Sequence, residues 1–458
     1  MRLLTLCCAL LWALPVMGQE QLPVTKLALS PQGEPKPALK FLLLPDLLDK
    51  KPGNSVQAFY KCFMEQNVLY HDKQLVEDRT KWLTCPLADL PKDAENYGGT
   101  SARQALYAAR LEGCDWQILQ QLKSDGINLL LPDIQQLRSL SQVLKVRTRG
   151  QVKAGKFDDA IRTIQTNLAL AKCLGEHPTL IGNLVCIAIA QQTIGTIEEL
   201  IQQPGAPNLY WALVQLPSSL VDVRQALQGE RVFVRSEFAG FTDPSRVWSD
   251  DDVAQIIAKV RGNSGMLNTK EAFADAERWV KARSEDAAWL QKSQQNLIEL
   301  GCPEAKVKQY PPGQVIFLRL LFRQEVLRDD MAKWAALPFW QADEAMERTE
   351  SAKLTDIEDI LASSLSAAVR KVRAAQARLD QRFAMLQVVE AIRLHAAAHD
   401  GKLPATPGDI KLPLPVDPVT GKPFEYTLRD GRGLLVNTVP KGTEKIMANH
   451  IRYEITLR

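Results

Sequence analysis

The spacing of apolar residues is the feature that most constrains how this chain can fold. From about Ser101 to Pro204, and again in later segments, apolar residues recur every three or four positions between short breaks at Gly, Asp or Pro. The run from about Leu354 to His399 has almost no helix-breaking residue, so we expect one or two long helices there. This pattern predicts a mainly α-helical protein.

The C-terminal residues follow a different period. Residues 424–428 and 451–457 alternate apolar and polar side chains, which indicates strands with one buried face. Asp430 and Gly431 predict a reversal between the first strand and the segment GLLVNTV. Because a lone two-stranded hairpin is marginally stable, we expect a three-stranded antiparallel sheet that packs on the preceding helix.

A predicted turn, DPVTGKPFEY (417–426), leads into the first of these strands. Asp417 and Pro418 predict a type I turn, because Pro fixes φ at the second position and Asp accepts a hydrogen bond at the first. Gly421 supplies a further positive φ. The fold class predicted is mainly α: a helical-hairpin array followed by a small C-terminal α+β module of one long helix and a short antiparallel sheet.

The segment KAGKFDDAI resembles the turn and the start of the second helix of a tetratricopeptide repeat. In that motif Gly155 would let the chain reverse, Phe157 would plug between the paired helices, and Ala160 would allow close helix contact. The preceding helix departs from the pattern, since Thr148 and Gln151 replace the expected small and aromatic residues. The resemblance implies a tetratricopeptide-like array with degenerate repeats; the alternative is an irregular helical bundle.

Two further resemblances concern the C-terminal part and the whole chain. Residues 390–430 resemble the C-terminal region of major type II secretion pseudopilins, in which a helix leads into a Pro- and Gly-containing turn and a strand. The apolar N-terminal helix that defines pilins is absent, so filament assembly is not implied. The chain also resembles an uncharacterised family of secreted bacterial proteins that share the motif GAPNLYWAL (205–213), and this family implies no activity.

The N-terminus predicts secretion. Met1 and Arg2 are followed by the apolar run Leu3–Val16, and small residues precede Gln19, which is the pattern of a signal peptide cleaved after Gly18. The run is shorter than the roughly 20 residues that a spanning helix needs. We expect no transmembrane segment after cleavage and an extracytoplasmic location, periplasmic or secreted.

At 458 residues the chain is long enough for two or three domains. Changes in composition divide it into a signal peptide (1–18), a Pro-rich linker (19–37), a tetratricopeptide-like helical domain (38–235), a second helical region (236–370) and a C-terminal helix-plus-sheet module (371–458).

Charge and cysteine content limit the partners and the chemistry. The 56 basic and 53 acidic residues are spread along the chain, so we expect no nucleic-acid partner. Of the eight cysteines, six remain after signal cleavage, and six allow 15 disulfide patterns that the sequence cannot rank. Cys173 and Cys186 lie in apolar helical segments, where a buried free thiol is the expected state.

Few residues suggest a chemical site. His395 and His399 have the i, i+4 spacing of zinc-binding helices, but the following Glu and further ligands are missing, so they are weak metal candidates. No nucleotide-binding motif and no catalytic set is recognisable, and we expect no cofactor. The leading hypothesis is a secreted non-enzymatic helical scaffold of the cell envelope that binds a protein or peptide partner in the groove of its hairpin array. The alternative is an extracytoplasmic hydrolase whose carboxylates converge only in the fold.

Overall fold

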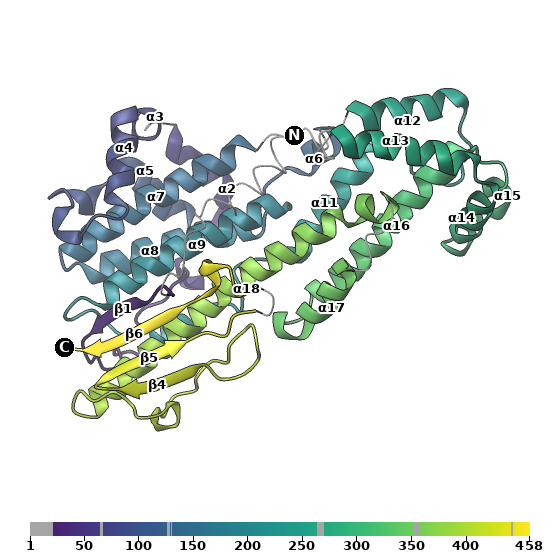
Figure 1. Cartoon of the computed structure of the whole chain (residues 1–458). Coiled ribbons are helices and arrows are strands. Elements are labelled where there is room, and N and C mark those ends of the chain that lie inside the picture. The colour runs from purple at the N-terminus through teal and green to yellow at the C-terminus, as the bar shows by residue number, and fades with distance from the viewer. Residues whose placement is uncertain are drawn as a thin grey trace. The chain divides into compact units, whose positions relative to one another are not determined.

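The computed structural model describes residues 22–64, 67–125, 129, 131–262, 270–351, 357–440 and 443–458, so the expected signal peptide lies outside the described residues. The protein is mainly helical with a small C-terminal sheet, as the sequence predicts (Figure 1). It divides into two compact units. The sheet-containing unit comprises the described parts of 20–118, 130–226 and 372–458, and the helical unit comprises those of 119–129 and 227–371.

The helices of the sheet-containing unit are α2 (Ser55–Tyr60), α3 (Asn67–His71), α4 (Lys73–Trp82), α5 (Gly99–Ala108), α7 (Pro132–Lys153), α8 (Phe157–Gly175), α9 (Leu180–Ile201), α10 (Tyr210–Val214) and the larger part of α18 (Ile357–Ala398). Its strands are β1 (Thr25–Leu29), β2 (Lys51–Asn54), β3 (Leu111–Gly113), β4 (Glu425–Arg429), β5 (Arg432–Val436) and β6 (Arg452–Leu457).

The helical unit contains α6 (Leu119–Asp125), most of α11 (Val223–Glu237), α12 (Asp250–Gly262), α13 (Lys270–Glu285), α14 (Ala287–Glu299), α15 (Glu304–Val307), α16 (Pro312–Ala335), α17 (Phe339–Ser351) and the first part of α18. Its core includes a cluster in which Leu297 of α14 and Leu318 of α16 are fully buried. A second, aromatic cluster packs Phe241 on Trp248 with ring centroids 5.2 Å apart.

The helical hairpin of α7 and α8 matches the predicted reversal. Gly155 has a φ of 70°, in the left-handed region that favours glycine, and it separates the two helices. Ala160 is fully buried, whereas Phe157 is only half-buried. At the position where the repeat motif has an aromatic residue, the buried Gln151 instead accepts a hydrogen bond from Thr163 at 2.9 Å. The hairpin is confirmed, and its kinship with tetratricopeptide repeats stays a prediction.

Helix α9 packs on both α7 and α8. By the length and composition of its most apolar window, α9 could cross a membrane, whereas no transmembrane segment is predicted there from the sequence. In the fold, 67% of that window is buried, including Cys186 and Ile194. Burial by neighbouring helices accounts for its apolar composition.

The C-terminal sheet has four strands in the order β1-β6-β5-β4 (Figure 1). Its β4–β5 and β5–β6 pairs are antiparallel, as predicted. The prediction of three strands is wrong, because β1 pairs in parallel with β6, with Thr25 opposite Tyr453. This strand lies within the predicted linker 19–37, where Leu27 and Leu29 are buried. Two alternating leucines are not enough to form a strand alone, so β1 depends on its pairing with β6, which is distant in the sequence.

Helix α18 is more deeply buried than a single apolar stripe predicts. Leu386, Val389 and Ile392 of the predicted stripe are fully buried, but so is Ala391 on the opposite face of the helix. The residues from Val372 onward accordingly cluster with the N-terminal segments in one compact unit.

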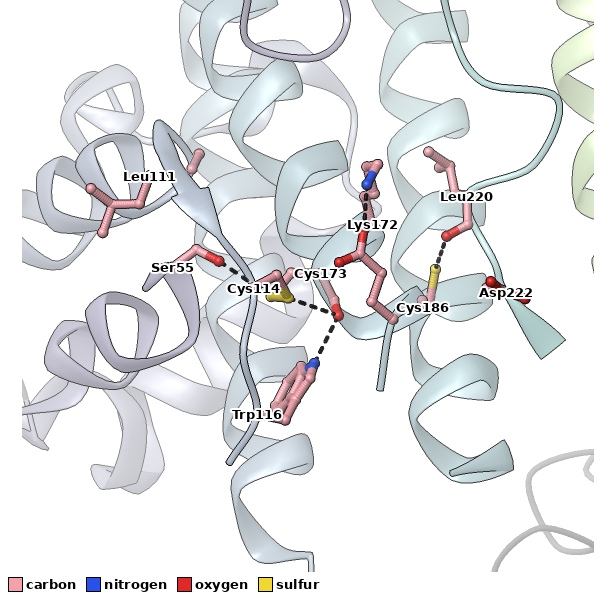
Figure 2. A network of polar contacts seen from close by, with 12 residues as sticks. Ser55, Leu111, Cys114, Trp116, Lys172, Cys173, Cys186, Leu220 and Asp222 are labelled. Carbon is pink, nitrogen blue, oxygen red and sulfur yellow. Dashed lines mark hydrogen bonds and ion pairs between the residues drawn. A yellow bond between two sulfur atoms is a disulfide. The ribbon is translucent and has the colours of Figure 1, made fainter. Parts of the chain in front are cut away.

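A disulfide joins Cys114, after β3, to Cys173 on α8, with the Cα atoms 5.9 Å apart (Figure 2). The Trp116 indole donates a hydrogen bond at 3.0 Å to the backbone carbonyl of Cys173, one of the two bonded cysteines. The expectation of a free thiol at Cys173 is therefore wrong, because the chain after β3 returns to α8 and brings Cys114 beside it. Cys186 is a buried free thiol, as predicted.

Candidate functional site

The C-terminal module contains an apolar pocket of about 260 Å³. Val388 and Ile392 stand one turn apart on α18, so both face the pocket from the same side of the helix. Tyr426 of β4 and Leu435 of β5 face it from the sheet. The full lining is Val388, Ile392, Pro407, Gly408, Ile410, Leu414, Pro415, Val416, Pro423, Phe424, Tyr426 and Leu435.

The rim of the pocket is held by the turn that the sequence singles out. Val416 and Pro423 pair as an isolated β-bridge on either side of the turn, and both line the pocket. Between them, the Asp417 carbonyl accepts the N–H of Thr420 at 3.1 Å, which is the hydrogen bond of the predicted β-turn. Gly421 has a φ of 68°, as predicted for this position. The turn therefore shapes the rim.

The side chain of Asp417 is fully buried and anchors the turn to the rest of the module. Its carboxylate accepts hydrogen bonds from Gln381 of α18 at 2.8 Å, from the Val419 N–H at 2.8 Å and from the Thr438 N–H at 3.2 Å. Burial raises the pKa of this carboxyl, and the hydrogen bonds oppose that rise. Its oxygens are occupied by donors within the module, so the Asp417 side chain holds the turn in place.

A second buried network gives the motif GAPNLYWAL (205–213) a structural role that the sequence does not predict. The side chains of Glu390 and Arg393 on α18 are completely buried and pair at 2.9 Å. The Glu390 carboxylate also accepts the Leu209 N–H at 2.5 Å, and Asn208 donates to the Glu390 carbonyl at 2.9 Å. Arg393 donates to the carbonyl oxygen of Ala206 at 2.9 Å. The motif thus fixes α18 against the helical layer, and α18 in turn carries one wall of the pocket.

A third network ties the sheet to the helices. Tyr453 of β6 donates a hydrogen bond to Glu198 of α9, and Arg382 of α18 pairs with the same carboxylate at 2.8 Å. Desolvation by burial raises the pKa of the Tyr453 hydroxyl, which therefore stays protonated as the donor. On the neighbouring strand β1, the Ala28 N–H donates to Gln202 of α9 at 3.2 Å.

The histidine pair near the end of α18 lies outside the pocket lining. The rings of His395 and His399 stack with centroids 3.9 Å apart, and His399 Nδ1 lies 2.7 Å from the His395 carbonyl oxygen. Desolvation and the neighbouring imidazole lower the pKa of His395. Among the described residues, no group of three or more His, Cys, Asp or Glu side chains is placed to hold a metal ion. The pair alone offers too few ligands for a tetrahedral zinc site.

One carboxyl is of interest for the hydrolase alternative. Burial raises the pKa of Asp380 on α18 to about 7, while a hydrogen bond from Ser219 and the charge of Arg373 oppose that rise. A carboxyl that titrates near neutrality could act as a general acid or base. Asp380 does not line the pocket, however, so the pocket and this carboxyl do not form one site.

No family model, no curated protein and no solved structure matches this chain.

Proposed function

We propose that this protein is a non-enzymatic binding protein that acts outside the cytoplasm and holds a protein or peptide partner through the apolar pocket of its C-terminal module. The observation that carries the proposal is the lining of this pocket, which consists of apolar side chains, prolines and one glycine, with the Tyr426 hydroxyl as its single side-chain polar group. That hydroxyl donates to the Pro404 carbonyl at 3.0 Å, so it is already engaged.

Such a lining recognises shape and apolar surface. Binding pockets for polar small molecules place a few polar groups at defined positions to orient the ligand, and this pocket lacks that arrangement. An aliphatic or aromatic side chain of a partner would gain roughly 0.8 kcal/mol for each CH₂ group that it buries there. The proposal therefore places the binding site in the C-terminal module, whereas the sequence favoured the groove of the helical hairpins.

The disulfide supports the compartment. Structural disulfides persist in oxidising environments and are rare in the cytosol, with hyperthermophiles as the exception. The disulfide joins Cys114 and Cys173, which are 59 residues apart in the chain. This favours folding outside the cytoplasm, in agreement with the predicted signal peptide.

A site-specific photo-crosslinker tests the proposal. We would place p-benzoylphenylalanine at Val416, which lines the pocket and is 51% exposed, and at the matched control Ile446, which is 48% exposed and lies outside the lining. In native envelope extracts we expect a discrete crosslinked partner from position 416 that is absent from position 446. Equal crosslinking at both positions, or at neither, would contradict the proposal.

A time course separates the proposal from the hydrolase alternative. A binder leaves the captured partner intact, whereas an enzyme releases shortened products from it. Progressive cleavage of the partner, abolished by Asp380→Asn, would overturn the non-enzymatic reading.

A further inference from the structure

Strand β4 forms an open edge of the C-terminal sheet. The strand order places β4 last, and from Glu425 to Arg429 it pairs only with β5 among the described residues (Figure 1). At the opposite edge, the Ala28 N–H of β1 is bound by the side chain of Gln202. An open edge presents unpaired N–H and C=O groups to any strand of suitable sequence.

The hairpin geometry shows which residues of β4 present these groups. Arg429 lies opposite Arg432 across the two-residue turn Asp430-Gly431, whose φ values of 45° and 71° are those of a type I′ turn. In such a hairpin the residues that flank the turn exchange both hydrogen bonds, and this alternates along the strand. Hydrogen-bonding groups of Tyr426 and Leu428 therefore point away from β5, towards the open edge.

The sequence of β4 is complementary to itself in the antiparallel sense. The strand reads Glu425-Tyr-Thr-Leu-Arg429. If two copies pair with Thr427 opposite Thr427, each Glu425 faces an Arg429 on the other copy, and each Tyr426 faces a Leu428. Opposite charges, Thr–Thr and aromatic–aliphatic pairs are all favourable cross-strand neighbours. In this register Tyr426 and Leu428 form the hydrogen-bonded pairs, which agrees with the direction of their backbone groups.

The charges of β4 are not satisfied within the chain. Arg429 stands directly opposite Arg432, a like charge that disfavours the pair, and Arg432 is itself bound by Glu454 at 3.3 Å. Glu425 faces the uncharged Val436. In the part of the chain that the structure describes, neither Glu425 nor Arg429 forms an ion pair, and both are exposed. A second copy would supply each with its counter-charge.

From this geometry we infer that two copies of this chain associate through their β4 edges, with a two-fold axis between the two Thr427 residues. The two sheets then form one continuous eight-stranded sheet. One strand pair alone buries less than the ~1,000 Å² of a typical stable interface, so the dissociation constant is expected in the micromolar range. The inference does not depend on the function proposed for the pocket.

Sedimentation equilibrium of the mature chain from about 1 to 300 µM tests the association. We expect a monomer–dimer equilibrium that weakens at least tenfold in Glu425→Arg and in Arg429→Glu, and that recovers in the double swap. The control Glu304→Arg changes an exposed carboxylate in the helical unit, 60% exposed, and should leave the equilibrium unchanged. A monomer across the whole range, or a double swap as weak as the single changes, would overturn the inference.

Disulfide trapping tests the register. At a non-hydrogen-bonded pair the Cβ atoms lie about 4.5–5.5 Å apart, so Thr427→Cys should form a covalent dimer under mild oxidation. Arg429→Cys places the two thiols several residues apart in this register and serves as the control. If Thr427→Cys does not crosslink faster than Arg429→Cys, the two-fold axis does not lie at Thr427.

Discussion

Replacing Arg393 by methionine should be among the most destabilising single changes in the protein. The Arg393 guanidinium is completely buried and donates to both Glu390 oxygens, at 2.9 and 3.1 Å. It also donates to the carbonyl oxygens of Ser30 at 3.2 Å and of Ala206 at 2.9 Å. Methionine keeps an unbranched apolar stem, but it is shorter than arginine and supplies no donor.

The expected loss of stability follows from the environment that remains around Glu390 after the change. The Glu390 carboxylate would keep the Leu209 N–H as a donor but lose its counter-charge in a dry site. Removing one partner of a buried pair typically costs about 3–5 kcal/mol, because the other charge stays buried and uncompensated. Arg393→Met should therefore lower the free energy of unfolding by about 4 kcal/mol. Adding Glu390→Gln, which removes the charge but keeps an acceptor for Leu209, should restore about half of the loss or more.

Urea denaturation followed by circular dichroism measures both changes, with attention to the slope as well as the midpoint. The control is Arg224→Met, which breaks the ion pair with Asp222 at a site where the side chains are 65% and 38% exposed. Exposed pairs contribute about 0–1 kcal/mol, so the control should stay close to the unmodified protein. If Arg393→Met costs no more than Arg224→Met, or if Glu390→Gln gives no rescue, the role assigned to this pair is wrong.

Three further predictions concern Asp417, Asp380 and the disulfide. Asp417→Asn turns an amide NH₂ towards backbone donors and should cost about 2 kcal/mol, with a lower urea midpoint and faster proteolysis around the pocket rim; unchanged proteolysis would contradict this. Because burial raises the folded pKa of Asp380 to about 7, above its unfolded value, the stability it contributes is present below pH ~4 and lost as the pH rises through 7. The unfolding free energy should fall by about 1–3 kcal/mol from pH 5 to pH 8, and Asp380→Asn should flatten this slope; equal slopes would refute the assignment. Cys114→Ser opens a loop of 59 residues to Cys173 and should cost up to about 4 kcal/mol, matched by reduction of the unmodified protein; insensitivity to reductant would contradict the bond.

The sequence predicts those parts of the fold that depend on neighbours along the chain. The long helix α18, the reversal at Gly155, the turn at Asp417 and the hairpin at Gly431 all follow from periodicity and from residues that set φ locally. Strand β1 does not, because TKLAL is short and its partner β6 lies more than four hundred residues further along the chain. Pairing over such a separation leaves no local signal.

The sequence predicts the turn at the rim of the candidate site but not the pocket itself. The turn residues Asp417 and Gly421 follow from the sequence. The pocket does not, because α18, β4 and the segment 407–416 come together only in the folded protein. Glu390 and Arg393 stand three residues apart and read as an ordinary surface pair, since nothing local shows that both are buried. The Asn-containing motif at 205–213 was a usable signal, because an Asn within an apolar stretch calls for buried hydrogen-bond partners.

The central claim is that the apolar pocket of the C-terminal module binds a partner. It is tested most directly by competition against the Val416 photo-crosslink. Unlabelled protein carrying Val416→Asp sets a carboxylate at the rim, and unlabelled Ile446→Asp makes the same change at a site of similar exposure outside the lining. We predict that the unmodified protein and Ile446→Asp suppress the crosslink equally, whereas Val416→Asp requires at least tenfold more protein, about 1.4 kcal/mol in binding free energy. Equal competition by all three proteins would show that the pocket is not the binding site.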